Sequence, residues 1–328
     1  MSDSKHLWAL VLAAGEGRRL RRLTTTGNGT AVPKQFCALA GGRSLLQDAI
    51  ARAARLAPPE RICAIVAAQH RRWWSGQLQA LPPANIVVQP QNRGTAHGIL
   101  LPLLVILERD PRARIVLLPS DHHVRDEARL ALSLGMAASP PADRARIVLL
   151  GLAPRTADPQ LGYIVPGAAC GRAHQGVERF VEKPDPDAAA ALVAGGALWN
   201  AFIIAADAAA LLELFERHCP GIVAAMRRIV RGGAGRVEFV EALAVLYEQL
   251  PTLDFSQSIL QRQERSLRVL SVPECGWSDL GTPDRVAEAL DALGADEEAP
   301  GPPPLGEPAL LSLAARHREI YRSGAAAP

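Results

Sequence analysis

Glycines and cationic residues gather near the start of this chain, between Leu7 and Gln35. An apolar run, residues 7–13, leads into Gly15-Glu16-Gly17-Arg18-Arg19, and a polar loop then leads to Pro33-Lys34-Gln35. Backbone N–H groups of a glycine turn can approach phosphate oxygens, and nearby cations can hold the phosphate charge. The stretch is therefore predicted to bind phosphate groups. The alternative is a glycine turn with solvated arginines.

The glycine turn lacks the features of two common nucleotide-binding loops. A dinucleotide fingerprint would need a third glycine where Leu20 stands, and the chain contains no G-K-[ST] tripeptide. These absences exclude a Rossmann dehydrogenase and a P-loop NTPase. The chain also offers no Ser/His/Asp or Cys/His arrangement that would indicate nucleophilic catalysis.

Two aspartates occupy positions suited to a metal ion. Asp121 follows an apolar run closed by Pro119-Ser120, and Asp279 lies in a glycine-bounded turn before a helix start. Mg²⁺ needs only one or two protein carboxylates when phosphates supply its other ligands, so the pair is predicted to hold Mg²⁺. Each aspartate could instead cap a helix. The adjacent His122-His123 pair has no third ligand at zinc-like spacing, which argues against a zinc site.

Lysine and asparagine are rare in this chain, so their positions are informative. Only Lys5, Lys34 and Lys183 occur among 36 basic residues, which indicates that the last two need a compact ammonium; the alternative is chance retention on the surface. Glu182-Lys183 ends a strand-like run, so its charges are expected on opposite faces. Asn200 lies inside the apolar run LWNAFIIA, where an unpaired amide would cost roughly 1–3 kcal/mol. A ligand or a backbone partner must satisfy it.

Strands alternate with helices over the first half of the chain. Strands are predicted at 7–13, 61–67, 85–88 and 114–118, and helices at 43–56, 70–80, 95–109 and about 126–138. This alternation predicts βαβ units in an α/β fold, with helices on both faces of a mixed, mainly parallel, Rossmann-like sheet. Ligands of such sheets bind at the carboxyl ends of the strands.

The second half adds paired strands and further helices. Segments 161–166 and 176–181 are expected to form an antiparallel pair, with other strands at 146–151, 198–205 and 267–272 and helices at 186–194, 207–218, 220–231, 237–250 and 282–293. Residues 1–293 are thus assigned to one main domain. Residues 294–328 are assigned to a Pro/Gly-rich linker and a short helix over 309–322.

Composition argues against several classes of protein. The net charge is +3, with 36 basic and 33 acidic residues, so there is no electrostatic reason to bind nucleic acid or an anionic membrane. No apolar run approaches about 18 residues, and we expect no membrane span or secretory signal. Five scattered cysteines without a C-x-x-C pair favour a reducing, cytoplasmic location over a disulfide framework or a zinc site.

Eight segments follow one another in an order typical of one enzyme family: GEGRR, PKQF, QPQNRGTA, LPSDH, LGYIVPG, VERFVEKPD, LWNAF and GWSDLGTPD. Over roughly residues 7–290 the chain resembles the sugar-1-phosphate nucleotidyltransferases, and among them most closely the mannose-1-phosphate guanylyltransferases. The resemblance implies transfer of a nucleoside monophosphate from an NTP, with GTP expected, to a sugar 1-phosphate, with mannose 1-phosphate expected. Mg²⁺ is the implied cofactor, pyrophosphate the second product, and residues 1–293 the catalytic domain.

The same resemblance implies roles for the matching residues. The catalytic cations would be Arg19 and Lys34 on the triphosphate and Lys183 on the sugar phosphate. The nucleotide would be bound by Ala14, Gly15, Gly17, Gln89, Arg93 and Thr95, the sugar by Gly162, Tyr163, Glu182 and Asn200, and Mg²⁺ by Asp121 and Asp279. The sequence does not reveal the oligomeric state, although it is compatible with a homodimer.

The chain departs from the guanylyltransferase pattern at several points. Ala13-Ala14 precede Gly15 in place of Ser-Gly, Ala201-Phe202 follow Asn200 in place of Ser-Gly, and Asp254-Phe255 stand in place of Asp-Tyr. The longer segment 24–31 is expected to be either an ordered lid over the nucleotide or a loop that orders when GTP binds. Two alternative functions stay open: a uridylyl- or thymidylyltransferase that uses glucose 1-phosphate, and a non-catalytic regulatory paralogue.

Overall fold

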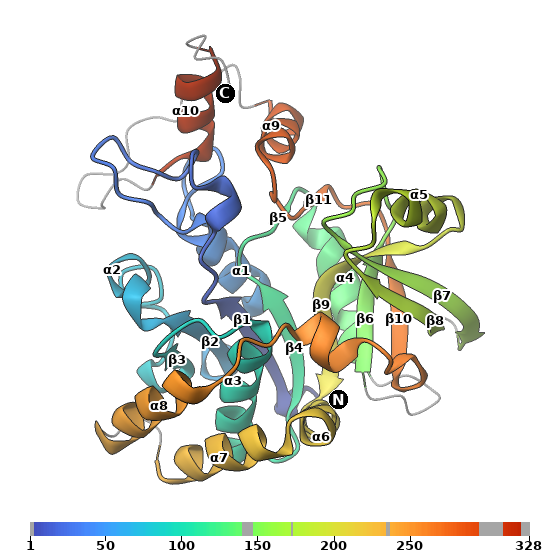
Figure 1. Ribbon diagram of the computed structural model, residues 1–328. Helices are drawn as coiled ribbons and strands as arrows, with labels where there is room; N and C mark the ends of the chain where they lie inside the picture. The colour runs from blue at the N-terminus through green and yellow to red at the C-terminus, as the bar shows by residue number, and fades with distance from the viewer. Residues whose placement is uncertain (1–2, 140–146, 172, 234–236, 295–310, 323–328) are drawn as a thin grey trace.

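A single mixed sheet forms the centre of the molecule (Figure 1). The computed structural model describes residues 3–139, 147–171, 173–233, 237–294 and 311–322. Within these ranges nine strands join in the order β3-β2-β1-β4-β9-β6-β10-β8-β7. The predicted α/β architecture is confirmed.

The parallel part of the sheet comes from the first half of the chain. It contains β1 (Leu7–Ala13), β2 (Ile62–Ala67), β3 (Ile86–Gln89) and β4 (Arg114–Pro119), all paired in parallel. All six residues of β2 are buried, as expected for a strand covered on both faces. The carboxyl ends of the four strands therefore meet at one edge.

Antiparallel pairing dominates the other part of the sheet. Strand β9 (Leu198–Asp207) runs antiparallel between β4 and β6 (Ile147–Leu152), and β10 (Leu267–Val272) runs parallel to β6. The predicted hairpin is longer than expected, formed by β7 (Gly162–Cys170) and β8 (His174–Glu182). Two short strands that the sequence pattern did not reveal, β5 (His123–Val124) and β11 (Trp277–Ser278), form a separate antiparallel ribbon.

Helices cover both faces of the sheet because alternate strand residues point to opposite sides. On β1, Val11 packs in one apolar cluster and Leu10 in the other. The first cluster includes residues of α1 (Leu45–Ala54), α4 (Glu127–Ala138), α5 (Pro186–Ala194) and α9 (Pro283–Ala292). The second includes residues of α3 (Thr95–Arg109), α6 (Ala208–His218), α7 (Pro220–Arg231) and α8 (Val237–Gln249), which gather at the lower edge of Figure 1.

Capping residues account for most helix starts. Ser44 forms a capping box with Gln47 at the start of α1, and the side chain of Thr282 caps α9. The helix predicted over 70–80 is much shorter, because α2 spans only Arg71–Trp74. Its last residue is fixed by a hydrogen bond from the Trp74 indole to the Ala67 carbonyl, and the chain then turns at Ser75-Gly76.

The C-terminal segment packs beside the N-terminal third of the chain. Helix α10 (Leu313–His317) is followed by a π-helical turn, Arg318–Arg322, while residues 309–310 of the predicted helix and most of the predicted linker lie outside the described residues. The backbone of Ala38 bonds to Leu311 and Leu313 at 3.0 and 2.9 Å, and Leu313 is fully buried. The terminal segment therefore braces the chain four residues beyond Lys34.

Candidate active site

A cavity of about 310 Å³ lies at the carboxyl ends of β1, β3 and β4. This is the edge at which α/β sheets usually bind ligands. Twelve of the residues predicted from the sequence line it: Ala14, Gly15, Gly17, Arg19, Gln89, Thr95, Asp121, Gly162, Glu182, Lys183, Asn200 and Asp279. The predicted residues that do not line it are Lys34, Arg93 and Tyr163.

The glycine loop and the Lys34 segment lock together at one end of the cavity. Gly17 has a φ of 62°, and a Cβ atom on it would lie only 2.8 Å from the backbone nitrogen of Lys34. The side-chain amide of Gln35 donates to the carbonyls of Ala13 and Gly15 at 3.2 and 2.8 Å. Only glycine therefore fits position 17 while keeping this contact.

Lys34 lies behind the cavity wall and connects the two predicted metal ligands. Its side chain is 5% exposed, and its Nζ donates to the backbone carbonyls of Asp279, at 2.6 Å, and Leu280, at 3.3 Å. The same Nζ lies 3.1 Å from Oδ2 of Asp121. A compact ammonium makes all three contacts at once, which is the preference that the scarcity of lysine predicted.

The β5–β11 ribbon brings Asp121 and Asp279 together. Its register pairs Ser278 with His123 and Trp277 with Val124, so each aspartate lies just beyond the same end of the ribbon. Residues more than 150 positions apart in the chain thus become neighbours in space.

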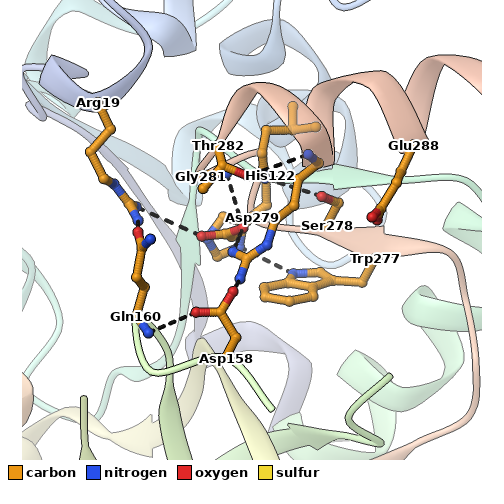
Figure 2. A network of polar contacts seen from close by, with 12 residues as sticks. Arg19, His122, Asp158, Gln160, Trp277, Ser278, Asp279, Gly281, Thr282 and Glu288 are labelled. Atoms are coloured by element: carbon orange, nitrogen blue, oxygen red, sulfur yellow. Dashed lines mark hydrogen bonds and ion pairs between the residues drawn. The ribbon is translucent and has the colours of Figure 1, made fainter. Parts of the chain in front are cut away.

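Arg19 reaches across this end of the cavity. One guanidinium nitrogen lies 3.7 Å from Oδ2 of Asp279, and another donates to Oε1 of Gln160 at 2.8 Å (Figure 2). The Arg19 side chain is half exposed. It is therefore accessible to an anionic ligand from the cavity.

Glu182 and Lys183 lie on the same side of the chain, so the predicted alternation across opposite faces is wrong. Both residues line the cavity, and Nζ of Lys183 lies 3.3 Å from Oε1 of Glu182. The reason is that β8 ends at Glu182, and Lys183 adopts a left-handed backbone with a φ of 48°. Gly162 allows this arrangement, since a Cβ atom there would lie 2.5 Å from Oε2 of Glu182.

Asn200 and Gln89 present amide groups to the cavity. The backbone partner expected for Asn200 is present, because its Oδ1 accepts a hydrogen bond from the N–H of Phe202 at 3.0 Å. Gln89 is 1% exposed, and its Oε1 has no hydrogen-bond partner among the described residues. An N–H donor of a bound ligand would satisfy that buried oxygen.

Arg93 and Tyr163 have their side-chain polar groups engaged elsewhere. The guanidinium of Arg93 donates to the carbonyls of Tyr247 and Glu248 at 2.8 and 3.2 Å, near the end of α8. The buried hydroxyl of Tyr163 bonds to the backbone N–H and carbonyl of Asp158. Both residues thus support neighbouring chain segments, and their predicted ligand contacts stay predictions.

Residues 24–31 fold into a tight loop. Thr25 and Ala31 form an antiparallel bridge, and the N–H of Thr26 donates to the carbonyl of Thr30 at 2.9 Å. None of these residues lines the cavity. The loop is held by its own backbone contacts, and the predicted role as a lid stays a prediction.

Burial and charge act differently on three of the carboxylates that line the cavity. Burial raises the pKa of Glu182 and of Asp279, although Lys183 opposes the change in the first and Lys34 in the second. Partial burial also opposes ionisation of Asp121, but the charge and hydrogen bond of Lys34 together with the charges of His122 and Arg19 outweigh it, so the pKa of that carboxyl is lowered. Asp121 is thus held as a carboxylate at neutral pH.

The two aspartates fit a magnesium ion that also binds phosphates. Both supply hard oxygen donors to the same cavity, and the Asp121 side chain is 42% exposed there. Among the described residues no group of three or more His, Cys, Asp and Glu side chains is placed to hold a metal. A site with two carboxylates matches the way Mg²⁺ binds when a nucleotide supplies its remaining ligands.

Comparison with known proteins places the chain in a family. A family model described as nucleotidyl transferase matches residues 8–295. The chain belongs to this family.

Relatives of this nucleotidyl transferase include a xanthan biosynthesis protein and a mannose-1-phosphate guanylyltransferase. The xanthan biosynthesis protein XanB of Xanthomonas campestris pv. campestris is 31% identical over 83% of this chain and 57% of its own length. The mannose-1-phosphate guanylyltransferase ManC of Salmonella typhimurium is 30% identical over 84% of this chain and 58% of its own. The chain therefore spans little more than half the length of these relatives.

Solved structures agree with the fold of this nucleotidyl transferase. A crystal structure described as mannose-1-phosphate geranyltransferase from Thermus thermophilus has a TM-score of 0.71 and 29% identity, covering 84% of this chain and 76% of the other. A UDP-glucose pyrophosphorylase bound to UDP-glucose, at 12% identity and a TM-score of 0.56, is similar over 87% of this chain and 97% of its own and shares the fold alone.

Sequence reasoning assigned no ligand role to several residues that line the cavity of this nucleotidyl transferase. They include Asp254, which accepts a hydrogen bond from the Thr95 hydroxyl at 3.4 Å, and His122, whose Nδ1 accepts one from the Trp277 indole at 3.2 Å. His122 and His123 line two different cavities, so the two histidines considered for a zinc site do not face the same space. The sequence signal at Asp254 is its place in a segment that departs from the family pattern.

Within the described ranges, no helix is both long enough and apolar enough to span a bilayer.

Proposed function

We propose that this nucleotidyl transferase moves a nucleoside monophosphate from an NTP to a sugar 1-phosphate and releases pyrophosphate. We assign GTP as the NTP and mannose 1-phosphate as the acceptor. The observation that carries the proposal is the position of Lys34 behind the cavity wall, with its Nζ 3.1 Å from Asp121 and 2.6 Å from the carbonyl oxygen of Asp279. Two further cations, Arg19 and Lys183, line the cavity itself. Such a site matches polyphosphate chemistry next to a metal ion.

The two cationic residues that line the cavity, Arg19 and Lys183, are suited to two different substrates. Arg19 stands by the glycine loop and is suited to a triphosphate, because a guanidinium fork binds phosphate oxygens in pairs. Lys183 lies on the other wall, next to Glu182 and Asn200, and is suited to the phosphate of the sugar. Glu182 can accept hydrogen bonds from sugar hydroxyls, and the Asn200 amide can donate to them.

The chemistry needs no general base. A phosphate monoester has a second pKa near 6 and is an anion at neutral pH. One of its oxygens attacks the α-phosphorus of the NTP in line with the leaving group. The bond from that phosphorus to the oxygen bridging the β-phosphate breaks, and pyrophosphate leaves with that oxygen and its electron pair. The residues contribute by positioning the two phosphates and by balancing their charge.

Asp121 and Asp279 would hold Mg²⁺ beside the triphosphate. Bound there, Mg²⁺ would neutralise negative charge on the phosphate oxygens. The lowered pKa of Asp121 supports this assignment, because a carboxylate that is ionised at neutral pH is the form that binds the metal.

The choice of GTP and mannose 1-phosphate is supported by the names of several relatives, including the Salmonella enzyme. The unpaired Oε1 of the buried Gln89 supports a base that presents an N–H donor, and guanine presents two adjacent ones. The departure at Phe202 lies beside Asn200 on the sugar side of the cavity, so the choice of sugar is the part of the proposal that it bears on.

A substrate panel tests the proposal. Pyrophosphate release is measured with GTP, ATP, UTP and dTTP, each paired with mannose 1-phosphate and with glucose 1-phosphate. We expect the fastest turnover with GTP and mannose 1-phosphate. Faster turnover with UTP or dTTP and glucose 1-phosphate would overturn the guanylyl assignment, and no turnover with any pair would point to a non-catalytic paralogue.

A further inference from the structure

Arg285 joins Asp279, which lines the cavity, to Asp158, which lies in the loop that carries the cavity-lining Gln160. It is the third residue of α9, and its side chain is 13% exposed. One of its terminal nitrogens pairs with Oδ1 of Asp279 and the other with Oδ2 of Asp158. Neither the sequence motifs nor the proposed reaction assigns a role to this residue.

Asp158 belongs to the β6–β7 loop, residues 153–161, which carries part of the sugar-side wall. Its Oδ1 accepts a hydrogen bond from the N–H of Gln160 at 2.7 Å. The hydroxyl of Tyr163 holds its backbone from both sides, at 2.8 and 3.0 Å. Gln160, Leu161 and the following Gly162 line the cavity, so the position of Asp158 sets the position of this wall.

The contacts close into a ring of five side chains. Arg285 pairs with Asp158, and the loop of Asp158 also carries Gln160. Gln160 accepts a hydrogen bond from Arg19. Arg19 in turn faces Asp279, whose pairing with Arg285 completes the ring. Figure 2 shows Arg19, Gln160, Asp158 and Asp279 facing one another around this ring. The ring thus connects the glycine loop, the metal-side carboxylate and the sugar-side loop.

Arg285 also orients the carboxylate of Asp279. Oδ1 of Asp279 accepts from Arg285 and from the N–H of Gly281, which lies 3.0 Å away. Oδ2 is the oxygen that faces Arg19. One oxygen is thereby fixed by the protein, and the other is directed toward the cavity.

We propose that Arg285 is a positioning residue that sets Asp279 and the β6–β7 loop in one arrangement, so that the metal side and the sugar side of the cavity are aligned by a single guanidinium. The inference rests on the proposed function for its kinetic consequences. Its physical basis is the planar guanidinium, in which one terminal nitrogen donates to Asp279 and the other forms an ion pair with Asp158. A lysine ammonium is a single point charge, so Asp279 and Asp158 could both contact it only by moving toward one position.

Two variants separate this role from a simple contribution to folding. Arg285→Lys keeps the charge and loses the fork. Arg285→Met combined with Asp158→Asn removes the guanidinium together with one of the charges it balances, which leaves Asp279 facing Arg19 and avoids two unpaired buried carboxylates. Arg155→Met is the matched control, because Arg155 lies in the same loop and pairs with Glu288 of α9 at an exposed site, 4.0 Å apart.

We expect both test variants to raise the Mg²⁺ concentration needed for half-maximal rate and the KM for the sugar phosphate, each about 10- to 100-fold, as for other residues that orient metal ligands. The KM for the NTP should change much less, and Arg155→Met should match the wild type. Wild-type constants in Arg285→Lys would overturn the proposal. A rise in only one of the two constants would also overturn it, because the two walls would then not be set together.

A second measurement does not depend on turnover. Amide hydrogen exchange of residues 153–161, recorded on the full chain without substrates, should be about tenfold faster in Arg285→Lys than in the wild type or Arg155→Met. Equal exchange in all three proteins would overturn the positioning role. If the wild type transfers no nucleotide in the substrate panel, the proposed function fails, and the exchange result still decides whether Arg285 fixes the loop.

Discussion

The ammonium of Lys34 lies 2.6 Å from the backbone carbonyl oxygen of Asp279, although 245 positions separate the two residues in the chain. The contact joins the segment that follows the glycine loop to the segment that precedes α9. Because Lys34 also reaches Asp121, it connects the two residues that we assign to the metal ion.

Replacing Lys34 should reduce turnover sharply even when the positive charge is kept. The buried ammonium has two carbonyl partners and one carboxylate, and a larger planar guanidinium cannot reproduce these contacts. We expect Lys34→Met and Lys34→Arg each to lower kcat at least about 100-fold, the scale seen when one electrostatic contact is lost. Steady-state kinetics measure this. Lys5→Arg, at an exposed position, is the control, and a Lys34→Arg enzyme as active as that control would contradict the assignment.

Replacing Asp121 with asparagine should act through the metal ion. The change keeps the size of a partly exposed side chain but removes the carboxylate that pairs with the buried Lys34 ammonium, so the chain should still fold, with a lower melting temperature. Turnover at limiting Mg²⁺ should fall about 100-fold or more. A titration of rate against Mg²⁺ concentration measures the effect. Asp126→Asn is a matched control, since Asp126 caps α4 and asparagine caps a helix equally well. Normal activity of Asp121→Asn at limiting Mg²⁺ would refute the metal assignment.

His122 should make the folded chain sensitive to mild acid. Burial lowers the pKa of His122 to about 4, while nearby Asp121 opposes the change. An unfolded histidine has a pKa of about 6.5, so between these values the unfolded chain binds a proton that the folded chain does not. Stability is therefore lost as the pH falls from about 6.5 toward 4, by about 2 kcal/mol at pH 5.

Urea unfolding at pH 7.5 and pH 5.0 tests this linkage. Other groups titrate in both proteins, so the comparison is between the wild type and His122→Gln. The loss of unfolding free energy between the two pH values should be smaller in the variant by about 2 kcal/mol. An identical loss in both proteins would rule out the buried neutral histidine.

At position 202, glycine should give a more stable protein than alanine, which is the reverse of the usual order. Phe202 lines the cavity with a left-handed φ of 53°, and its ring packs edge-to-face on Phe255. A side chain in this conformation costs about 1–2 kcal/mol. Phe202→Gly should therefore unfold with a free energy about 1 kcal/mol higher than Phe202→Ala, which loses the same ring and keeps the strain.

Urea unfolding of the two Phe202 variants measures the difference. The neighbouring Ala201 has no positive φ. Ala201→Gly should therefore lower the free energy of unfolding by about 0.5–1 kcal/mol. Both Phe202 variants should also raise the KM for the sugar phosphate. Equal stability of Phe202→Ala and Phe202→Gly would show that the position is not strained.

The sequence by itself determined the elements and the chemical types at the sheet edge. Periodicity and caps predicted β1, α3, α5, α7 and β10 with their observed bounds, because apolar alternation and capping residues are local properties. The glycine loop, the isolated lysines and the aspartates after apolar runs pointed to phosphate and Mg²⁺, and the order of eight segments pointed to the family that the comparison confirmed.

Only the tertiary structure decided how these groups meet. The β5–β11 ribbon is two residues long on each side, too short to leave a pattern, yet its register makes Asp121 and Asp279 neighbours. The left-handed turn at Lys183 reversed the predicted separation of its charge from Glu182. The guanidinium of Arg93 was engaged by the backbone of Tyr247, 154 positions away in the chain. Long-range packing, register and backbone strain set these relationships, since none of them is encoded within a single stretch of sequence.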